Sequence, residues 1–134
     1  MKTLLYSDKE GSYRLFDYDQ SHSLLLFRKH KGKHLEYNID VLFKGVYSLN
    51  ISIIYKGLHI YSVDRLNNQT ANNLANRNIV FMLRDNEELI SYIDAAAFGV
   101  FENSLNYTES SLSNFKENTA KKPKIWFAES SLRK

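Results

Sequence analysis

The sequence of 134 residues contains no cysteine and one proline. The absence of cysteine excludes disulfide bonds, thiolate nucleophiles and cysteine-based metal sites, and it favours a reducing compartment. Pro123 lies near the C-terminus, so every residue before it keeps the backbone N–H that a sheet ladder requires. The chain also lacks the roughly 18 consecutive apolar residues of a membrane-spanning helix, and its first apolar run is too short for a signal peptide. We therefore expect a cytoplasmic protein with no membrane partner.

No strong charge of either sign is present. The 18 Lys and Arg residues exceed the 15 Asp and Glu residues by a net charge of +3. This mild excess suits an acidic partner, but it falls well short of the dense basic surface typical of a dedicated nucleic-acid binder. Hydrophobic residues make up 43% and charged residues 25%, as in an ordinary globular protein, and the length fits a single domain over residues 1–134.

Period-two alternation is the clearest pattern in the sequence. Apolar residues alternate with polar ones over residues 35–43, with Leu42 as the one exception, and the pattern resumes over residues 47–55 after Gly45. Such alternation predicts strands with one face buried and one face in water, and therefore an antiparallel sheet. Gly45 stands where a bulge or sharp bend would suit a curved sheet.

Further strands are predicted over residues 13–18, 23–30, 58–63, 79–84 and 89–101, with a short edge strand over residues 3–7 and a turn at residues 10–12. Residues 125–127 fit either a terminal strand or an anchor to the core. Four consecutive apolar residues place the strand over 23–30 at the centre of the sheet. A short helix is predicted over 109–117 with Thr108 as its N-cap, whereas residues 64–78 fit a short helix and a long loop equally well. Residues 115–134 fit a loosely packed C-terminal tail.

We therefore predict a mainly β protein, an antiparallel curved sheet, sandwich or partly open barrel of about eight strands with one short helix outside. The predicted core residues lie at the apolar positions of the strands. They are Leu24, Leu26, Tyr37, Ile39, Val41, Leu49, Ile51, Ile53, Ile60, Phe81 and Ile93.

Positive charge concentrates at one predicted hairpin tip, which makes it the best electrostatic candidate for a partner-binding site. The residues of this tip are Arg28, Lys29, His30, Lys31, Lys33 and His34. A solvated turn kept soluble by its lysines is the structural alternative. His59 and Tyr61 are out of phase with Leu58 and Ile60, so we expect them on an exposed surface and add them to the candidate site.

The sequence has no signature of catalysis. It contains no nucleophile elbow, glycine-rich phosphate loop, zinc-protease motif or dinucleotide fingerprint, and no cofactor is expected. Asp17 and Asp19 could share one face, but we expect them, like Asp40 and Asp94, to face water. His22, His30 and His34 lack the further ligands of a metal site, so none is expected. No catalytic residue is assigned.

Residues 15–28 and 37–47, which read LFDYDQSHSLLLFR and YNIDVLFKGVY, resemble small uncharacterised bacterial proteins of mainly β structure. Some of these are similar to immunity proteins, which protect a cell from a toxin of its own or of a neighbour. The resemblance covers residues 13–63, rests on strand patterning, and implies a role in protein binding without any catalytic residue.

Four functions follow from this reading. The favoured one is a protein-binding module, specifically an immunity protein that occludes the active site of a toxin through a complementary surface. Inhibitors of nucleases tend to be acidic, so the target face of this basic chain is expected to be acidic or apolar. The alternatives are a small-molecule or nucleic-acid binding β-barrel, an enzyme with a dispersed site, and a structural or assembly subunit.

Overall fold

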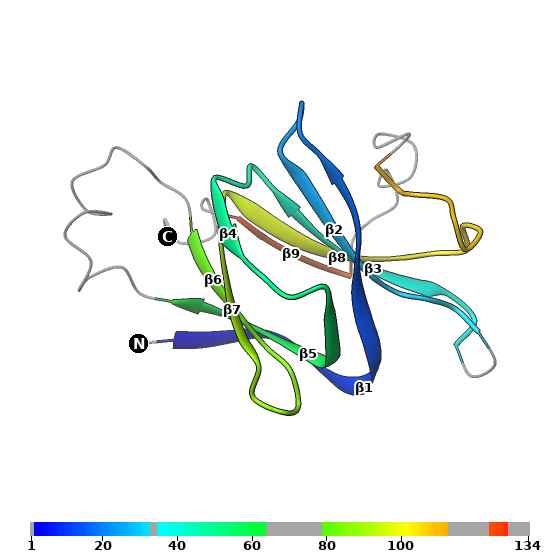
Figure 1. The fold of residues 1–134 in the computed structure, drawn as a ribbon, viewed down its shortest axis with the longest axis horizontal. Helices are drawn as coiled ribbons and strands as arrows, with labels where there is room; N and C mark the ends of the chain where they lie inside the picture. The colour runs from blue at the N-terminus through cyan, green and yellow to red at the C-terminus, as the bar shows by residue number, and fades with distance from the viewer. Residues whose placement is uncertain (1, 33–34, 64–78, 113–123, 129–134) are drawn as a thin grey trace.

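The computed structural model describes residues 2–32, 35–63, 79–112 and 124–128, which form nine strands in one sheet (Figure 1). In chain order the strands are β1 (Lys2–Asp19), β2 (Leu24–Lys29), β3 (Asn38–Lys44), β4 (Ser48–Asn50), β5 (Ile54–Val63), β6 (Ile79–Arg84), β7 (Ile90–Ala95), β8 (Ala97–Asn103) and β9 (Ile125–Ala128). Their order in the sheet is β4-β7-β6-β5-β1-β2-β3-β8-β9, and every pair is antiparallel. The predicted mainly antiparallel β class is confirmed, and β4 and β9 are the edges of the open sheet.

β1 joins the two halves of the sheet. It pairs with β5 along its first part and with β2 along its last part, and the register shifts between Asp8 and Ser12. Gly11 has a φ of +75°, and a Cβ there would lie 2.8 Å from the Lys29 side chain. The turn predicted at residues 10–12 is therefore wrong: glycine permits an irregularity within one 18-residue strand rather than an end to it.

A second bend links the β3–β8 ladder to the β4–β7 ladder. The backbone N–H of Ala96 donates to the carbonyl of Lys44 at 3.0 Å, and that of Tyr47 donates to Asp94 at 2.7 Å. Gly45, with a φ of +66°, allows the chain to turn beside Ala96, where a Cβ would lie 2.9 Å from the alanine methyl group. The bend predicted at Gly45 is confirmed, whereas the single strand predicted over 89–101 is divided at Ala96 into β7 and β8.

Aromatic rings fill the space between the two halves of the bent sheet. Phe81 on β6 lies 5.4 Å from Phe43 on β3 and 5.3 Å from Phe98 on β8, measured between ring centroids. β6 is not a sheet neighbour of β3 or β8, so these contacts arise because the sheet bends and packs its inner face on itself. Phe127 on β9 packs against the same cluster, so this part of the predicted loose tail is anchored to the core.

The predicted core is confirmed in part. Leu24, Leu26, Val41, Ile60, Phe81 and Ile93 are buried, and Ile39 and Ile51 are partly buried. The prediction is wrong for Tyr37, Leu49 and Ile53, of which Ile53 is 71% exposed. Tyr37 precedes β3, Leu49 lies in the three-residue edge strand β4, and Ile53 lies between β4 and β5. Alternation predicts burial only where the chain is a covered strand, and most of residues 47–55 is not.

Two other predictions concern segments near the ends of described ranges. Residues 109–112 are not helical, and the remainder of the helix predicted over 109–117 lies outside the described residues. Residues 64–78 also lie outside them.

The inner aromatic cluster gives a first prediction. Phe81→Ala should lower the free energy of unfolding by about 3–5 kcal/mol, because it leaves a cavity among packed rings. Ile53→Ala is the control, and it should change stability by no more than about 0.5 kcal/mol, because its side chain is exposed. Urea denaturation of both variants measures the difference, and equal losses would contradict the assignment of Ile53 to the surface.

Candidate functional site

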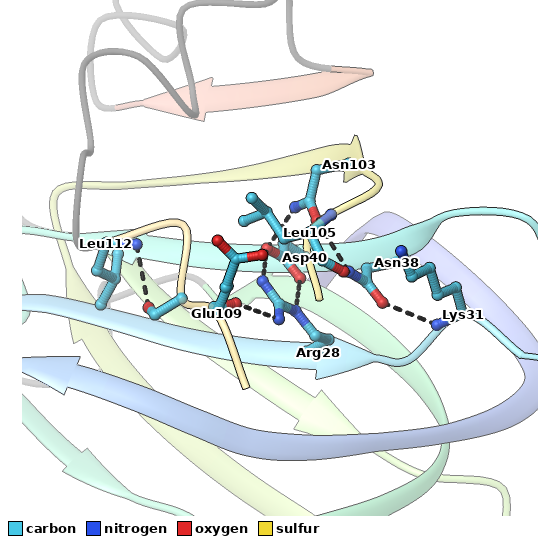
Figure 2. Close-up of polar contacts among 9 residues, drawn as sticks. Arg28, Lys31, Asn38, Asp40, Asn103, Leu105, Glu109 and Leu112 are labelled. Carbon is cyan, nitrogen blue, oxygen red and sulfur yellow. Dashed lines mark hydrogen bonds and ion pairs between the residues drawn. The ribbon is translucent and has the colours of Figure 1, made fainter. Parts of the chain in front are cut away.

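Arg28, the first residue of the predicted basic tip, is buried in an ion pair. Its Nε donates to Oδ1 of Asp40 at 2.6 Å, and one terminal nitrogen donates to Oδ2 at 2.8 Å (Figure 2). The other terminal nitrogen donates to the carbonyl of Glu109 at 2.6 Å, and the guanidinium lies 4.1 Å from the centroid of the Phe16 ring. Arg28 is 0% exposed, so it belongs to the interior and is not available to a partner.

Asp40 is buried too, which corrects the prediction that it faces water. It lies directly opposite Arg28 in the β2–β3 register and also accepts a hydrogen bond from Nδ2 of Asn103 at 2.7 Å. Asn38 extends the network by donating to Oδ1 of Asn103 at 2.9 Å. The polar positions of β3 are therefore paired inside the protein, as buried polar groups must be.

The cause of this burial is a segment that covers the outer face of β2, β3 and β8. Residues 104–112, here called the covering segment, are held by three side chains that donate to its carbonyls: Lys31, after β2, to Ser104, Asn38 on β3 to Leu105, and Arg28 on β2 to Glu109. Its apolar end inserts Leu112 among Leu24, Leu26, Leu42 and Phe101. Both faces of β2 are thus buried, as predicted for a central strand. Lys31 is engaged here through its ammonium group.

Lys29 forms a separate cluster at the bend of β1. Its ammonium donates to Oδ2 of Asp8 at 2.6 Å and to the carbonyl of Glu10 at 3.1 Å. The Tyr13 hydroxyl also donates to Asp8, and it is hydrogen-bonded to Tyr6 at 2.6 Å. Burial disfavours the charged form of Asp8, but the hydrogen bonds from Lys29 and Tyr13 outweigh it and hold the pKa of this carboxyl below its usual range. Burial and the neighbouring Asp8 raise the pKa of Tyr13.

His30 lies between two aromatic rings. It stacks on Tyr107 with centroids 4.2 Å apart and meets Phe16 edge-on at 5.3 Å. Burial and the nearby Arg28 lower the pKa of His30, so its ring is neutral at neutral pH. Lys33 and His34, the remaining residues of the predicted tip, lie outside the described residues.

The predicted basic tip is therefore not one surface. Arg28 is buried, and Lys31 donates a hydrogen bond to the covering segment. Lys29 forms an ion pair with Asp8, and His30 stacks on Tyr107. The concentration of positive charge in the sequence reflects internal partners as much as external ones.

The acidic and histidine candidates lie elsewhere. Asp17 accepts a hydrogen bond from the backbone of Tyr18, and Asp19 accepts from Ser21 and His22 beside the β1–β2 turn. The hydrogen bond from Ser21, together with His22, lowers the pKa of Asp19. Within the described part of the chain, no three His, Asp or Glu side chains gather closely enough to hold a metal ion.

His59 and Tyr61 lie on the outer face of β5, as predicted from their phase, while Leu58 and Ile60 are buried on the inner face. Tyr61 stands opposite Leu4 on β1 and opposite Met82 on β6, which in turn faces Tyr92 on β7. These side chains form a cross-strand apolar row. The row and its neighbours on the same side of the sheet form a surface that we call the open face. Its residues are Leu4, His59, Tyr61, Met82, Arg84, Ile90 and Tyr92.

Cations border the apolar row of the open face. Arg84 donates to the Tyr61 hydroxyl at 3.2 Å, and the Lys2 ammonium lies 5.0 Å from the centroid of the Tyr61 ring. His59 is fixed between Ser7 at 2.7 Å and Asn86 at 2.8 Å. Of this face, the sequence assigned only His59 and Tyr61 to the candidate site. The alternation of β7 could have revealed Ile90 and Tyr92, because these two exposed residues flank the buried Ser91 and therefore share the outward face.

Comparisons of the chain with protein-family models, curated proteins and solved structures found no match. The described residues contain no helix with the length and apolar character needed to cross a membrane. The site is therefore interpreted from its own geometry.

The buried ion pair gives a second prediction. Asp40→Asn should lower the free energy of unfolding by about 3–5 kcal/mol, because it leaves the Arg28 charge buried without a counter-ion. Replacing both residues, Arg28→Met with Asp40→Leu, should cost less, because no charge is then left unpaired. Chemical denaturation of the two variants compares them, and a double variant less stable than Asp40→Asn would contradict this account.

The Asp8 cluster gives a third prediction, on pH dependence. Because the pKa of Asp8 is lower in the folded state, its contribution to stability is complete above about pH 5 and is lost as the pH falls through the folded pKa. The stability difference between the wild type and Asp8→Asn should therefore shrink between about pH 5 and pH 2. Denaturation curves at several pH values measure it, and a difference that stays constant over this range would count against the lowered pKa.

Proposed function

We propose that this protein is a protein-binding module that docks through its open face, and specifically a cytoplasmic immunity protein that neutralises a bacterial toxin by occluding its active site. The binding role is supported by one contrast between the two halves of the sheet. The outer face of β2, β3 and β8 is covered by residues 104–112, which bury Leu26, Leu42 and Phe101. No described segment covers the outer face of β5, β6 and β7 in this way.

The open face has the composition of a protein interface. Leu4, Ile90 and Tyr92 are each about half exposed, at 52%, 50% and 47%. Met82, 6% exposed, lies between the two tyrosines of the row. Large apolar side chains grouped half-exposed on one face favour a protein-binding role, and tyrosine and arginine are enriched where binding energy concentrates.

The charge of the open face defines the partner surface. Arg84 and Lys2 border the apolar row, so a complementary surface has an apolar centre with carboxylates around it. This agrees with the expectation that a basic inhibitor meets an acidic or apolar face. The immunity role itself rests on the resemblance of residues 13–63 and on the protein-binding character of this surface.

An internal ligand site is the less favoured function. Phe27, Phe43, Phe81 and Phe98 are fully buried, and their rings occupy the space between the two halves of the sheet. A small molecule held inside the sheet would have to displace them, at the energetic cost of opening a packed core.

Capture of the partner is the fourth prediction. Tagged wild-type protein should retain one stoichiometric protein from its native lysate, identified by mass spectrometry. With the purified partner, Tyr92→Ala should weaken binding roughly 30-fold by calorimetry, because it removes a central aromatic contact worth about 2 kcal/mol. Tyr47→Ala is the matched control, since Tyr47 is an exposed tyrosine outside the open face and its loss should leave affinity unchanged.

The result also tests the immunity role. If the retained partner is a toxin, added wild-type protein should abolish its activity and Tyr92→Ala should inhibit less well. Retention of nucleic acid in place of protein, or equal affinities of the two tyrosine variants, would contradict the proposal.

A further inference from the structure

A cavity of about 640 Å³ lies beside the bend of β1, and it shares no residue with the open face. It is lined by residues 10–12 and Arg14 of β1, by Lys29 at the end of β2, by described residues of the loop that follows β2, and by Tyr107 of the covering segment. The cavity is open to solvent, and its volume lies within the range found for small-molecule sites. Gly11 keeps the wall close to β2, because a Cβ there would meet the Lys29 side chain.

One cation in the cavity wall is free to bind a ligand. Lys29 is neutralised by Asp8, whereas Arg14 is exposed and forms no ion pair with the described residues. A guanidinium binds carboxylate and phosphate groups through two parallel hydrogen bonds. Glu10 also lines the cavity, and the negative charge of its carboxylate repels an anionic ligand and weakens its binding.

The His30–Tyr107 stack offers an apolar surface on which an aromatic ring of a ligand could pack. One face of the Tyr107 ring lies on His30, with 25° between the ring planes, while the residue is 69% exposed. His30 holds this ring in place through the stack, with the two ring centroids 4.2 Å apart. Planar groups stack on such anchored rings.

We propose that this cavity binds a small planar anion, an aromatic ring that carries a carboxylate or a phosphate, with the anionic group on Arg14 and the ring on Tyr107. The two groups are supplied by different elements, β1 and the covering segment. A ligand that contacts both would bridge them. This site shares no residue with the open face, so the binding of a small anion and the binding of a protein are tested independently.

Calorimetry or NMR titration of the full chain with four probes tests the proposal. Benzoate and AMP each carry a ring and an anionic group, inorganic phosphate carries only the charge, and adenosine carries only the ring. At least one of benzoate and AMP should bind with a Kd on the order of 1 mM or below, and more tightly than the single-group probes. Benzoate and AMP distinguish a carboxylate ligand from a phosphate ligand.

Variants at the cavity should change this affinity in opposite directions. Arg14→Gln should weaken binding roughly tenfold or more, because it removes a charged hydrogen-bond pair. Glu10→Gln should strengthen it by removing a repelling carboxylate. Tyr107→Ser should weaken it roughly fivefold or more, whereas Tyr107→Phe should not, because phenylalanine retains the ring.

Arg84→Gln is the matched control, because it removes the same charge from the open face and should leave ligand affinity unchanged. Melting temperatures of all variants confirm that they are folded. No binding of benzoate or AMP at millimolar concentration would overturn the proposal. So would binding of both benzoate and AMP that is no tighter than that of inorganic phosphate and adenosine, or an Arg14→Gln variant that binds like the wild type.

Discussion

The buried ion pair of Arg28 with Asp40 is the interaction on which the arrangement of the outer surface depends. Two charges inside a protein lose their hydration, so they persist only where hydrogen bonds replace it. Here Asp40 receives donors from Arg28 and Asn103, and the remaining donor of Arg28 binds the Glu109 carbonyl. The pair therefore fixes the sheet register between β2 and β3 and, through Glu109, the position of the covering segment.

This arrangement makes the two halves of the sheet chemically different. The half built from β2, β3 and β8 buries both faces, so its outward polar residues form an internal network and its outward leucines form a second core. No described segment covers the outer face of the half built from β5, β6 and β7, where Ile90 and Tyr92 stay about half exposed. The open face is thus a consequence of where the covering segment lies, and the segment lies there because Arg28, Asn38 and Lys31 hold its carbonyls.

The two proposed binding surfaces use different physical means. The open face offers an apolar row on regular strands, whose geometry is fixed by the ladder and suits a broad protein partner. The cavity beside Arg14 lies at an irregularity of β1, where Gly11 and the Tyr107 stack create a concave shape that a regular strand does not provide. A flat surface and a cavity on one small sheet would therefore suit ligands of different size.

The sequence by itself determined the class of structure, because alternation over residues 35–43, the continuous apolar run of β2 and the lack of proline before residue 123 leave few options other than an antiparallel sheet. It also placed the bend at Gly45 and the outward phase of His59 and Tyr61. It could not show that Arg28 and Asp40 are buried, because alternation identifies the two faces of a strand but not what covers each of them.

Only the tertiary structure decided which polar residues are internal and which apolar residues are exposed. Residues 104–112 cover one outer face and bury Asp40, while the chain leaves β4 after three residues and exposes Ile53. Both outcomes depend on contacts between segments far apart in the chain. The physical reason is that burial is a property of the packed neighbours of a residue, whereas periodicity is a property of its own strand.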